Sequence, residues 1–250
     1  MHEFTYSTDR RLTGTPFGYG IRYQYILTKK NVRALFSLVF IHPVDARKIR
    51  WFIARSDGPV RISLGCGELV QPGWFGIDLK RAPSVFRADL RRRLPLATGS
   101  VDEILAEHVL EHLFLDEIPE LLSECHRALK VGGVLRVVSP NGLLIADILS
   151  GRSGPSVNRQ LSFEVALHRF ERDDLLFLRA ANRLTHQWGE HRSILTPDGV
   201  EILLASTGFS GIHHLDIETS HYFPQTPGTH LDRYPGSETE ASQSRRFVDE

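Results

Sequence analysis

Arg61-Ile-Ser-Leu-Gly-Cys-Gly67 is the stretch that decides the fold, and it continues from Glu68 to Leu79 with the ending Gly-Trp-Phe-Gly-Ile-Asp-Leu. A short apolar run enters a turn that contains Gly65 and Gly67, and a second apolar run ends in Asp78. In a parallel α/β sheet, glycines after the first strand let a ligand approach the backbone, and an acid at the end of the second strand binds ribose hydroxyls. The stretch therefore predicts a nucleoside site.

The connection between these two apolar runs is unusually short. A normal crossover between parallel strands contains a full helix, but the segment 68–74 includes Pro72 and Gly73 and has room for one helical turn at most. Gly-x-Gly also occurs in ordinary tight turns, so the two glycines alone leave that interpretation open. The carboxylate of Asp78, placed soon after Gly67, favours the nucleoside site. We expect any helix here to be vestigial.

The composition is that of a globular domain with an appendage. The chain has 250 residues, of which 41% are hydrophobic and 24% charged, and its formal net charge is zero, so we expect no nucleic-acid partner. Cys66 and Cys125 are too few for a disulfide framework and suit a reducing compartment. No apolar run is long enough to span a bilayer and no signal peptide is recognisable. We expect a cytoplasmic protein.

Residues 1–57 are predicted to form the appendage, an N-terminal arm followed by short helices at 31–41 and 45–55. Up to Arg61 the chain has eleven Lys and Arg against four Asp and Glu. Such a basic region can approach anionic lipid or a phosphorylated acceptor, which allows peripheral membrane contact, although a charged and solvated helix face is the commoner explanation. Asp57-Gly-Pro marks the boundary to the main domain.

Residues 58–250 are predicted to form one α/β domain. Strands are expected at 60–65, 74–79, 84–88, 101–106 and 133–139. One strong helix lies between the last two, because Ile118, Leu121, Leu122, Cys125 and Leu129 recur at steps of three and four before Gly132-Gly133. Strands joined by helices indicate a doubly wound, mostly parallel sheet that binds ligands at the carboxyl ends of its strands.

The second half of the domain departs from this alternation. Residues 143–190 are predicted to be an inserted substrate cover with a helical segment near 173–183, because an insertion of this length after a core strand commonly covers a site. Thr196-Pro197 indicates a helix start and Gly208 its end. Residues 211–219 and 244–248 suit a closing antiparallel pair.

Five motifs in this order resemble those of the class I S-adenosylmethionine-dependent methyltransferases. They are Leu64-Gly-Cys-Gly67, Pro72-Gly-Trp-Phe-Gly-Ile-Asp78, Ala88-Asp89-Leu90, Val109-Leu-Glu-His112 and Gly132-Gly-Val-Leu135. The likeness covers about residues 60–215 and is greatest to a small subgroup whose first loop reads Leu-Gly-Cys-Gly, followed by Pro-Gly-Trp and an Asp. It implies a Rossmann-like methyltransferase fold with an antiparallel last strand, and S-adenosyl-L-methionine as cofactor.

The resemblance also implies which residues bind the cofactor. Gly65, Cys66 and Gly67 would lie along its methionine part, Asp78 would bind the ribose hydroxyls, Asp89 and Leu90 would border the adenine, and Glu107, after Ala106, would lie by the sulfonium and amino groups. The family often has an acid where this chain has Ser63. The alternative for Asp78 and Asp89 is that they only cap loops.

The segment His108-Val-Leu-Glu111-His112 begins the strong helix or the turn before it. Positions i, i+3 and i+4 share one helical face, so these side chains should converge at the carboxyl end of the fourth strand, beside the acceptor. In one interpretation His108 is a general base or binds the acceptor, and His112 anchors the helix. In another, these polar residues only cap the helix start.

A third interpretation is a divalent metal bound by Glu111, His112 and His191, together with His108. It follows from a resemblance to the Glu-x-x-Glu-His face of the small-RNA 2′-O-methyltransferases and the ubiquinone-pathway O-methyltransferases, which have a further His shortly before the last helix. Two or three imidazoles and one carboxylate suit zinc or another transition metal better than magnesium.

These features predict an S-adenosylmethionine-dependent methyltransferase of class EC 2.1.1.-. His108, Asn141 and His191 are the candidate catalytic residues on the acceptor side. A hydroxyl acceptor is expected, and analogy with the resembled subgroup, often found beside glycan-building enzymes, favours a sugar or polysaccharide. The alternatives are another small molecule or an RNA 2′-hydroxyl, methylated with a metal. From other classes, the alternatives are a zinc metallopeptidase, whose His-x-x-Glu-His pattern the sequence matches, or a non-catalytic nucleoside-binding module.

Overall fold

The computed structural model describes residues 43–68, 70–80, 82–168, 170–215 and 239–244. The chain divides into two compact units, Met1–Phe40 and Ile41–Glu250, and every described residue belongs to the second. The predicted arm and the helix expected at 31–41 therefore lie outside the described residues. The helix expected at 45–55 is present as α3, Pro43–Ile53.

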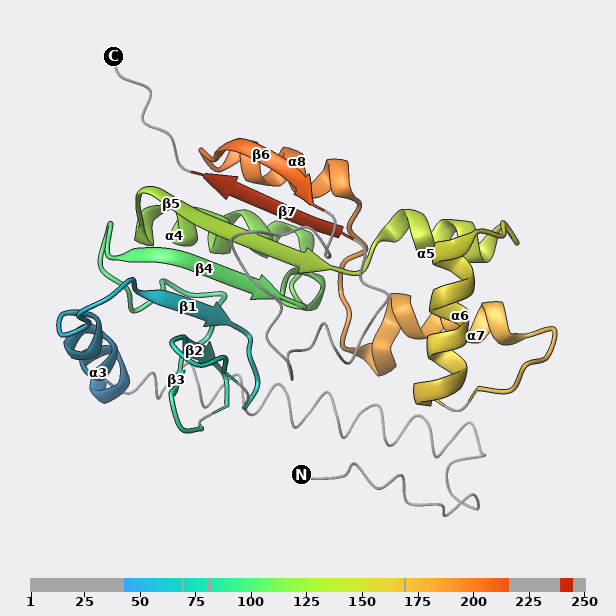
Figure 1. The fold of residues 1–250 in the computed structure, drawn as a ribbon, viewed down its shortest axis with the longest axis horizontal. Helices are drawn as coiled ribbons and strands as arrows, with labels where there is room; N and C mark the ends of the chain where they lie inside the picture. Colours follow the sequence, from blue (N-terminus) through green and yellow to red (C-terminus); the bar gives the residue numbers. More distant parts are fainter. Residues whose placement is uncertain (1–42, 69, 81, 169, 216–238, 245–250) are drawn as a thin grey trace. The chain divides into compact units, whose positions relative to one another are not determined.

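The centre of the second unit is a seven-stranded sheet of order β3-β2-β1-β4-β5-β7-β6 (Figure 1). Its strands are β1 Arg61–Leu64, β2 Phe75–Asp78, β3 Val85–Arg87, β4 Val101–Glu107, β5 Leu129–Ser139, β6 Ser210–Leu215 and β7 Thr239–Ser244. The first five strands pair in parallel, which confirms the predicted parallel sheet. β7 pairs antiparallel with both β5 and β6. Of the strand expected at 244–248, only Ser244 is among the described residues.

The remaining elements are helices and short 3₁₀ turns. They are η1 Leu110–His112, η2 Leu115–Glu117, α4 Ile118–Ala128, α5 Gly142–Leu149, α6 Pro155–His168, α7 Leu176–His186, η3 Gln187–Gly189 and α8 Pro197–Ser206. Thr196 caps α8 as predicted, since its side chain accepts a hydrogen bond from the Gly199 amide. The strong helix ends earlier than predicted, at Ala128, because Leu129 already begins β5.

One face of the sheet carries the main hydrophobic core. Ile62, Leu64, Ile104, Ala106, Leu135 and Val137 alternate with residues of the other face along three central strands, and all belong to this core. The apolar stripe of α4, residues of α8 and Ile49 of α3 pack against them. Helices of the described residues therefore form a layer on this face.

The opposite face is covered differently. Its small cluster consists of Leu105, Val134 and Val138 with Trp74, and Val70 packs against it. Trp74 and Val70 come from the short connection between β1 and β2, where residues 66–68 and 70–74 contain turns and no helix, as expected. A Cβ on Gly76 would lie 2.4 Å from the Cys66 sulfur, so this connection packs directly on β2. The prediction of a doubly wound sheet requires helices on this face as well, and it stays a prediction.

Helices α5, α6 and α7 form a group with a core of its own. Leu144, Ile145, Ile148, Val157, Ala180, Ala181 and Leu184 make up this second cluster, separate from the main core. α5 follows the carboxyl end of β5 directly, and α7 corresponds to the helical segment predicted near 173–183 (Figure 1). Helices α5–α7 therefore form a group at the edge of the sheet where parallel α/β folds bind ligands, and its role as an inserted cover stays a prediction.

Candidate active site

The turn after β1 has the backbone that the sequence predicts. Gly65 and Gly67 have φ of 62° and 65°, in the left-handed region that favours glycine. A Cβ on Gly65 would lie 2.7 Å from a methyl carbon of Val109, whereas a Cβ on Gly67 would meet nothing within 4 Å. The Gly67 amide donates a 2.8 Å hydrogen bond to Asp78 Oδ2. The two ends of the predicted nucleoside site are thus joined, with open space beside Gly67 for a ligand.

Cys66, between these glycines, has no nucleophilic character. Burial, with a smaller contribution from the charge of Asp78, raises the pKa of its thiol to about 12. The thiol therefore stays protonated near neutral pH. The sulfur packs toward β2, and any contact of Cys66 with the cofactor would come from its backbone.

Asp89 follows β3 and is buried, with 3% of its surface exposed. Both of its carboxylate oxygens accept hydrogen bonds from the Arg91 guanidinium, at 3.0 and 2.7 Å, and Oδ1 also accepts from the Arg91 amide. Burial raises the pKa of this carboxyl, but the Arg91 bonds and charge outweigh it, so the pKa lies below its usual value. Asp89 therefore caps its loop, as in the alternative interpretation, and contact with adenine stays a prediction.

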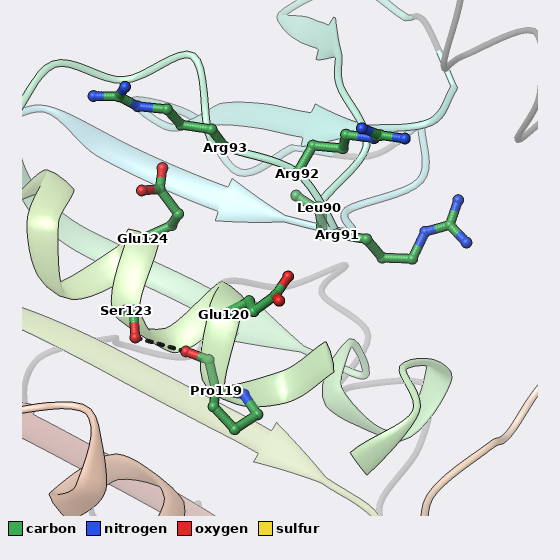
Figure 2. A pocket seen from close by; sticks show the side chains of 8 residues that line it. All are labelled: Leu90, Arg91, Arg92, Arg93, Pro119, Glu120, Ser123 and Glu124. Carbon is green, nitrogen blue, oxygen red and sulfur yellow. Dashed lines mark hydrogen bonds between the residues drawn. The ribbon is translucent and has the colours of Figure 1, made fainter. Parts of the chain in front are cut away.

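Sequence reasoning missed Arg91 and the pocket next to it. The pocket has a volume of about 520 Å³ and lies between residues 90–93 and the first half of α4, where Pro119, Glu120, Ser123 and Glu124 line it. Residues 90–93 form one wall of the pocket. Figure 2 shows the Arg91 and Arg92 side chains extending in one direction from this wall and the Arg93 side chain in the other. The signal was present in the sequence as three consecutive arginines after Asp89-Leu90.

Glu107 ends β4 beside the glycine turn, because Ala106 is in register with Leu64. Its Oε1 is buried without a hydrogen-bond partner among the described residues. Burial raises the pKa of Glu107, against the nearby charges of His108 and Arg136. Arg136, on the neighbouring strand, is 1% exposed, and burial lowers its pKa to about 10. Sequence reasoning placed Glu107 at this edge but gave no role to Arg136.

His108 and Glu111 form a hydrogen-bonded pair. His108 Nδ1 donates to Glu111 Oε1 at 2.8 Å, with 22% of the His108 side chain and 2% of the Glu111 side chain exposed. Burial lowers the pKa of His108, but the hydrogen bond and charge of Glu111, with the charge of Glu107, raise it above its usual value. Burial raises the pKa of Glu111, but the hydrogen bond and the charge of His108 outweigh it, so the pKa of this carboxyl lies below its usual value.

The pair lies in the turn before α4, one of the two predicted places, but the helical face predicted for residues 108–112 is not formed. His108 has a left-handed φ of 52°, and η1 comprises only Leu110–His112, so His108 is outside any helix. The sharp turn still brings His108 back to Glu111. His112 points elsewhere: its Nδ1 donates to the carbonyl oxygen of Glu190 at 3.1 Å.

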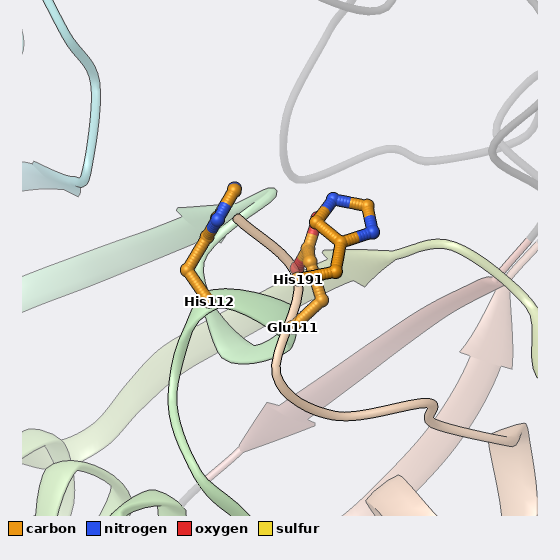
Figure 3. A group of neighbouring side chains, drawn as sticks. All are labelled: Glu111, His112 and His191. Atoms are coloured by element: carbon orange, nitrogen blue, oxygen red, sulfur yellow. The ribbon is translucent and has the colours of Figure 1, made fainter. Parts of the chain in front are cut away.

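His191 completes a second group with Glu111 and His112 (Figure 3). One ligand atom from each residue lies within 4.8 Å of the others, and the two imidazole centroids are 5.0 Å apart. His191 Nδ1 donates to the Leu184 carbonyl at 2.6 Å, while His191 Nε2 and Glu111 Oε2 are buried without a hydrogen-bond partner among the described residues. Burial lowers the pKa of His191 to about 4, so the imidazole is neutral near pH 7. His108 does not belong to this group, so the His-x-x-Glu-His metallopeptidase arrangement is not formed.

Segment 190–195 ties the insertion to the sheet edge. The Arg192 amide donates to the Glu111 carbonyl at 2.7 Å, and Ser193 Oγ donates to the Leu113 carbonyl at 2.7 Å. The Gly142 amide, at the start of α5, donates to the Leu195 carbonyl. Asn141, next to it, accepts from the Leu143 amide at 2.9 Å and caps α5. The expected contact of Asn141 with the acceptor stays a prediction.

The five parallel strands and the helices that pack against them form a Rossmann-like α/β fold, with the glycine turn at the carboxyl end of β1. Residues 77–137 match a protein family described as "Methyltransferase domain". These residues identify a class I S-adenosylmethionine-dependent methyltransferase domain in the chain. No curated protein matches its sequence. None of the described helices has the length and apolar character needed to cross a membrane.

Solved structures of methyltransferases are similar to the chain at low sequence identity. An S-adenosylmethionine-dependent methyltransferase from Mesorhizobium loti is 17% identical, with 80% of this chain and 96% of that chain covered and a TM-score of 0.44. One from Archaeoglobus fulgidus is also 17% identical, covering 89% and 99%, with a TM-score of 0.42. The chain spans only 50% of the CurJ carbon methyltransferase, at 12% identity, 77% coverage of this chain and a TM-score of 0.43. At such scores we infer nothing about the acceptor from them.

Proposed function

We propose that the protein methylates a hydroxyl group, that the acceptor is a sugar or polysaccharide, and that His108 takes the hydroxyl proton. The 2.8 Å bond from His108 Nδ1 to buried Glu111 carries this proposal, because it fixes one ring nitrogen and makes Nε2 the proton acceptor. The imidazole stands at the carboxyl end of β4, next to the glycine turn. The sugar class rests on the resemblance to the subgroup found beside glycan-building enzymes.

The chemistry asks little of the protein beyond alignment and proton removal. When bound, S-adenosylmethionine supplies a methyl group already activated by the positive sulfur. The acceptor oxygen would form a bond to the methyl carbon as the carbon–sulfur bond breaks, and the bond pair would remain on the departing sulfur. The hydroxyl proton would pass to His108 Nε2, and Glu111 would stabilise the resulting imidazolium. In the same proposal, residues 65–67, Asp78, Asp89, Leu90 and Glu107 bind the donor.

The test is transfer of a labelled methyl group to a panel of mono-, oligo- and polysaccharides, with calorimetry of S-adenosylhomocysteine binding. We expect the wild type to form a methyl ether that resists alkaline hydrolysis. His108→Gln should reduce methyl transfer by about 100-fold or more, as expected for loss of a general base. The affinity of the variant for S-adenosylhomocysteine should stay within about twofold of the wild-type value. His214→Gln is the matched control, because His214 contacts Glu201 at 2.9 Å on the exposed edge of the sheet.

Four outcomes would count against the proposal. An alkali-labile product would indicate a methyl ester and hence a carboxylate acceptor. Full transfer by His108→Gln would remove the base assignment, and loss of both transfer and binding would make His108 structural. A wild type that does not bind S-adenosylhomocysteine would contradict donor binding at the glycine turn.

A divalent metal at Glu111, His112 and His191 is the second candidate. Glu111 Oε2 and His191 Nε2 favour it, because neither has a hydrogen-bond partner in the part of the chain that the structure describes. Both imidazoles donate Nδ1–H to a backbone carbonyl, as metal-ligating histidines usually do, which directs Nε2 away from the backbone. Two neutral imidazoles and a carboxylate suit zinc or a similar transition metal. When bound, such an ion would lower the pKa of an acceptor hydroxyl. An RNA 2′-hydroxyl would belong with this alternative.

Elemental analysis of the purified protein tests the metal directly. We expect near-stoichiometric zinc or a related metal in the wild type and its loss in His191→Asn, while His214→Gln retains it. Calorimetric titration of Zn²⁺ into chelator-treated protein provides a second measure. Absence of metal together with full transfer after chelation would overturn this candidate.

Two finer expectations belong to the same proposal. We assign the protein to the cytoplasm, supported by Cys66 and Cys125, both free thiols. We also take the antiparallel pairing of β7 as the last-strand arrangement of class I methyltransferases.

A further inference from the structure

Helices α6 and α7 are joined by a buried ion pair outside the site described above. Arg183 Nε donates to Glu164 Oε2 at 2.5 Å, and Arg183 Nη2 donates to Glu164 Oε1, so the contact is a two-bond fork. The Glu164 side chain is 0% exposed and that of Arg183 8%. Gln160 Nε2, one turn earlier on α6, donates to Glu164 Oε1 at 2.7 Å. The charges are thus paired, hydrogen-bonded and shielded from solvent.

Such a pair is a poor choice for stability alone. Taking both charges out of water costs nearly as much as their attraction gains, and apolar side chains of similar size often stabilise as well. The pair lies on helices whose apolar cluster includes Val157, Ala180 and Leu184, and Gln160 and His168 are its polar neighbours. A rigid fork does, however, fix the rotation and height of one helix against another, because guanidinium and carboxylate meet in one plane.

The last turn of α7 connects this pair to the acceptor side. Leu184, the residue after Arg183, offers the carbonyl that accepts the 2.6 Å bond from His191 Nδ1. The helix then ends at Gln187, which has a left-handed φ of 37°, and the chain turns back toward η1. A rotation of α7 would therefore move the carbonyl that holds the His191 imidazole.

We propose that Arg183 and Glu164 are positioning residues, and that their fork sets α7 so that His191 presents Nε2 toward Glu111 and His112. The inference rests on the proposed function, in which this group faces the acceptor. The insertion then does more than cover the site: its internal ion pair determines the orientation of one of the site's imidazoles.

The test uses the full chain with ¹⁵N-labelled histidine rings and reads the state of His191 by long-range ¹H–¹⁵N spectra, with His191→Gln for assignment. We expect one neutral form protonated at Nδ1 in the wild type. Arg183→Met should remove or broaden that signal, and Glu164→Gln should do the same because the fork is lost. Arg183→Lys keeps the charge without the fork and should restore the signal in part.

Two matched variants separate positioning from general loosening. Arg179→Met breaks another two-bond fork, to Asp173 on the exposed side of α7, and should leave His191 unchanged. Ile148→Val removes one methyl from the same helical cluster, where Ile148 is 1% exposed, without touching the pair. An unchanged His191 signal in both Arg183→Met and Glu164→Gln would overturn the proposal. So would an equal disturbance by Ile148→Val.

Calorimetry with S-adenosylhomocysteine keeps this inference apart from the proposed function. If the wild type fails to bind the compound, donor binding fails, yet the His191 spectra still decide whether the fork positions the imidazole. If the compound binds and the fork variants leave His191 as it was, only the positioning role is lost.

Discussion

The turn around Gly67, where we propose that the donor binds, and the surroundings of His112, where we propose that the acceptor binds, are built in different ways. We call them the donor side and the acceptor side. The donor side joins Gly67 to Asp78, eleven residues apart, through one hydrogen bond inside a continuous motif. The acceptor side joins His112 to Glu190, 78 residues apart, and Ser193 to Leu113, 80 apart. The geometry of a contiguous motif can be predicted from the sequence. The geometry of a site whose residues are far apart in the chain depends on how the segments between them pack.

The largest expected effect falls on the donor side, at Gly65→Ala. The left-handed φ of 62° and the 2.7 Å approach to Val109 add strain and overpacking, together about 3 kcal/mol, so S-adenosylhomocysteine binding should be lost. Gly151→Ala is the control, since it has a φ of 69° but nothing within 4 Å. Calorimetry and thermal unfolding measure both; equal effects would mean that the contact with Val109 does not matter.

Asp78→Asn should have the next largest effect. It removes the negative charge of the carboxylate that accepts hydrogen bonds from the Gly67 amide and, in the proposal, from the ribose hydroxyls. We expect this to cost about 2 kcal/mol, or about 30-fold in S-adenosylhomocysteine affinity. The exposed Asp147, paired with Arg152 at 3.0 Å, gives the control Asp147→Asn. Unchanged affinity in Asp78→Asn would show that the carboxylate only closes the turn.

On the acceptor side, Glu111→Gln should reverse the direction of one pKa shift. In the wild type, NMR titration should place the pKa of His108 above its usual value, because Glu111 outweighs burial. Without that charge, burial and Arg183 dominate and the pKa should fall below it. Since the folded pKa is raised, the stabilising contribution of protonated His108 is complete below the usual pKa and is lost as pH rises through the raised one. A pKa that stays raised in the variant would contradict the assigned cause.

The smallest expected effect is that of Ser193→Ala. It removes the 2.7 Å bond to the Leu113 carbonyl, worth about 1 kcal/mol, and should loosen segment 190–195 without changing S-adenosylhomocysteine affinity. Ser206→Ala, which removes an exposed bond to Leu203, should cost less. Denaturant unfolding and calorimetry measure these effects. A loss of S-adenosylhomocysteine affinity in Ser193→Ala would contradict the expectation, because it would show that segment 190–195 affects donor binding.

The sequence predicted the five parallel strands, the short first connection and the turn around Gly65, because each depends on residues close together in the chain. It misplaced the end of α4, since nothing local shows that Leu129 begins pairing with Val101. It also expected one helical face at 108–112, whereas the left-handed backbone of His108 breaks it. That conformation has no reliable sequence signal in a histidine.

For the acceptor side, the sequence predicted which residues come together but not how they pair. Glu111, His112 and His191 were expected together and the structure brings them together, while His108 belongs to a separate pair. Arg183 and Glu164 were missed, because nineteen residues separate them and each resembles an ordinary charge on a helix surface. Only the packing of α6 on α7 shows that both are buried.

Segment 190–195 has a consequence for the order in which the enzyme is made. The donor turn can close once residue 78 has left the ribosome, but the bonds of Arg192 and Ser193 to the 111–113 turn wait for more than a hundred further residues. Closing a loop of about 80 residues rather than about 11 costs roughly 2 kcal/mol more in chain entropy. A nascent chain would therefore form the turn proposed to bind the donor long before it forms the contacts that complete the proposed acceptor side.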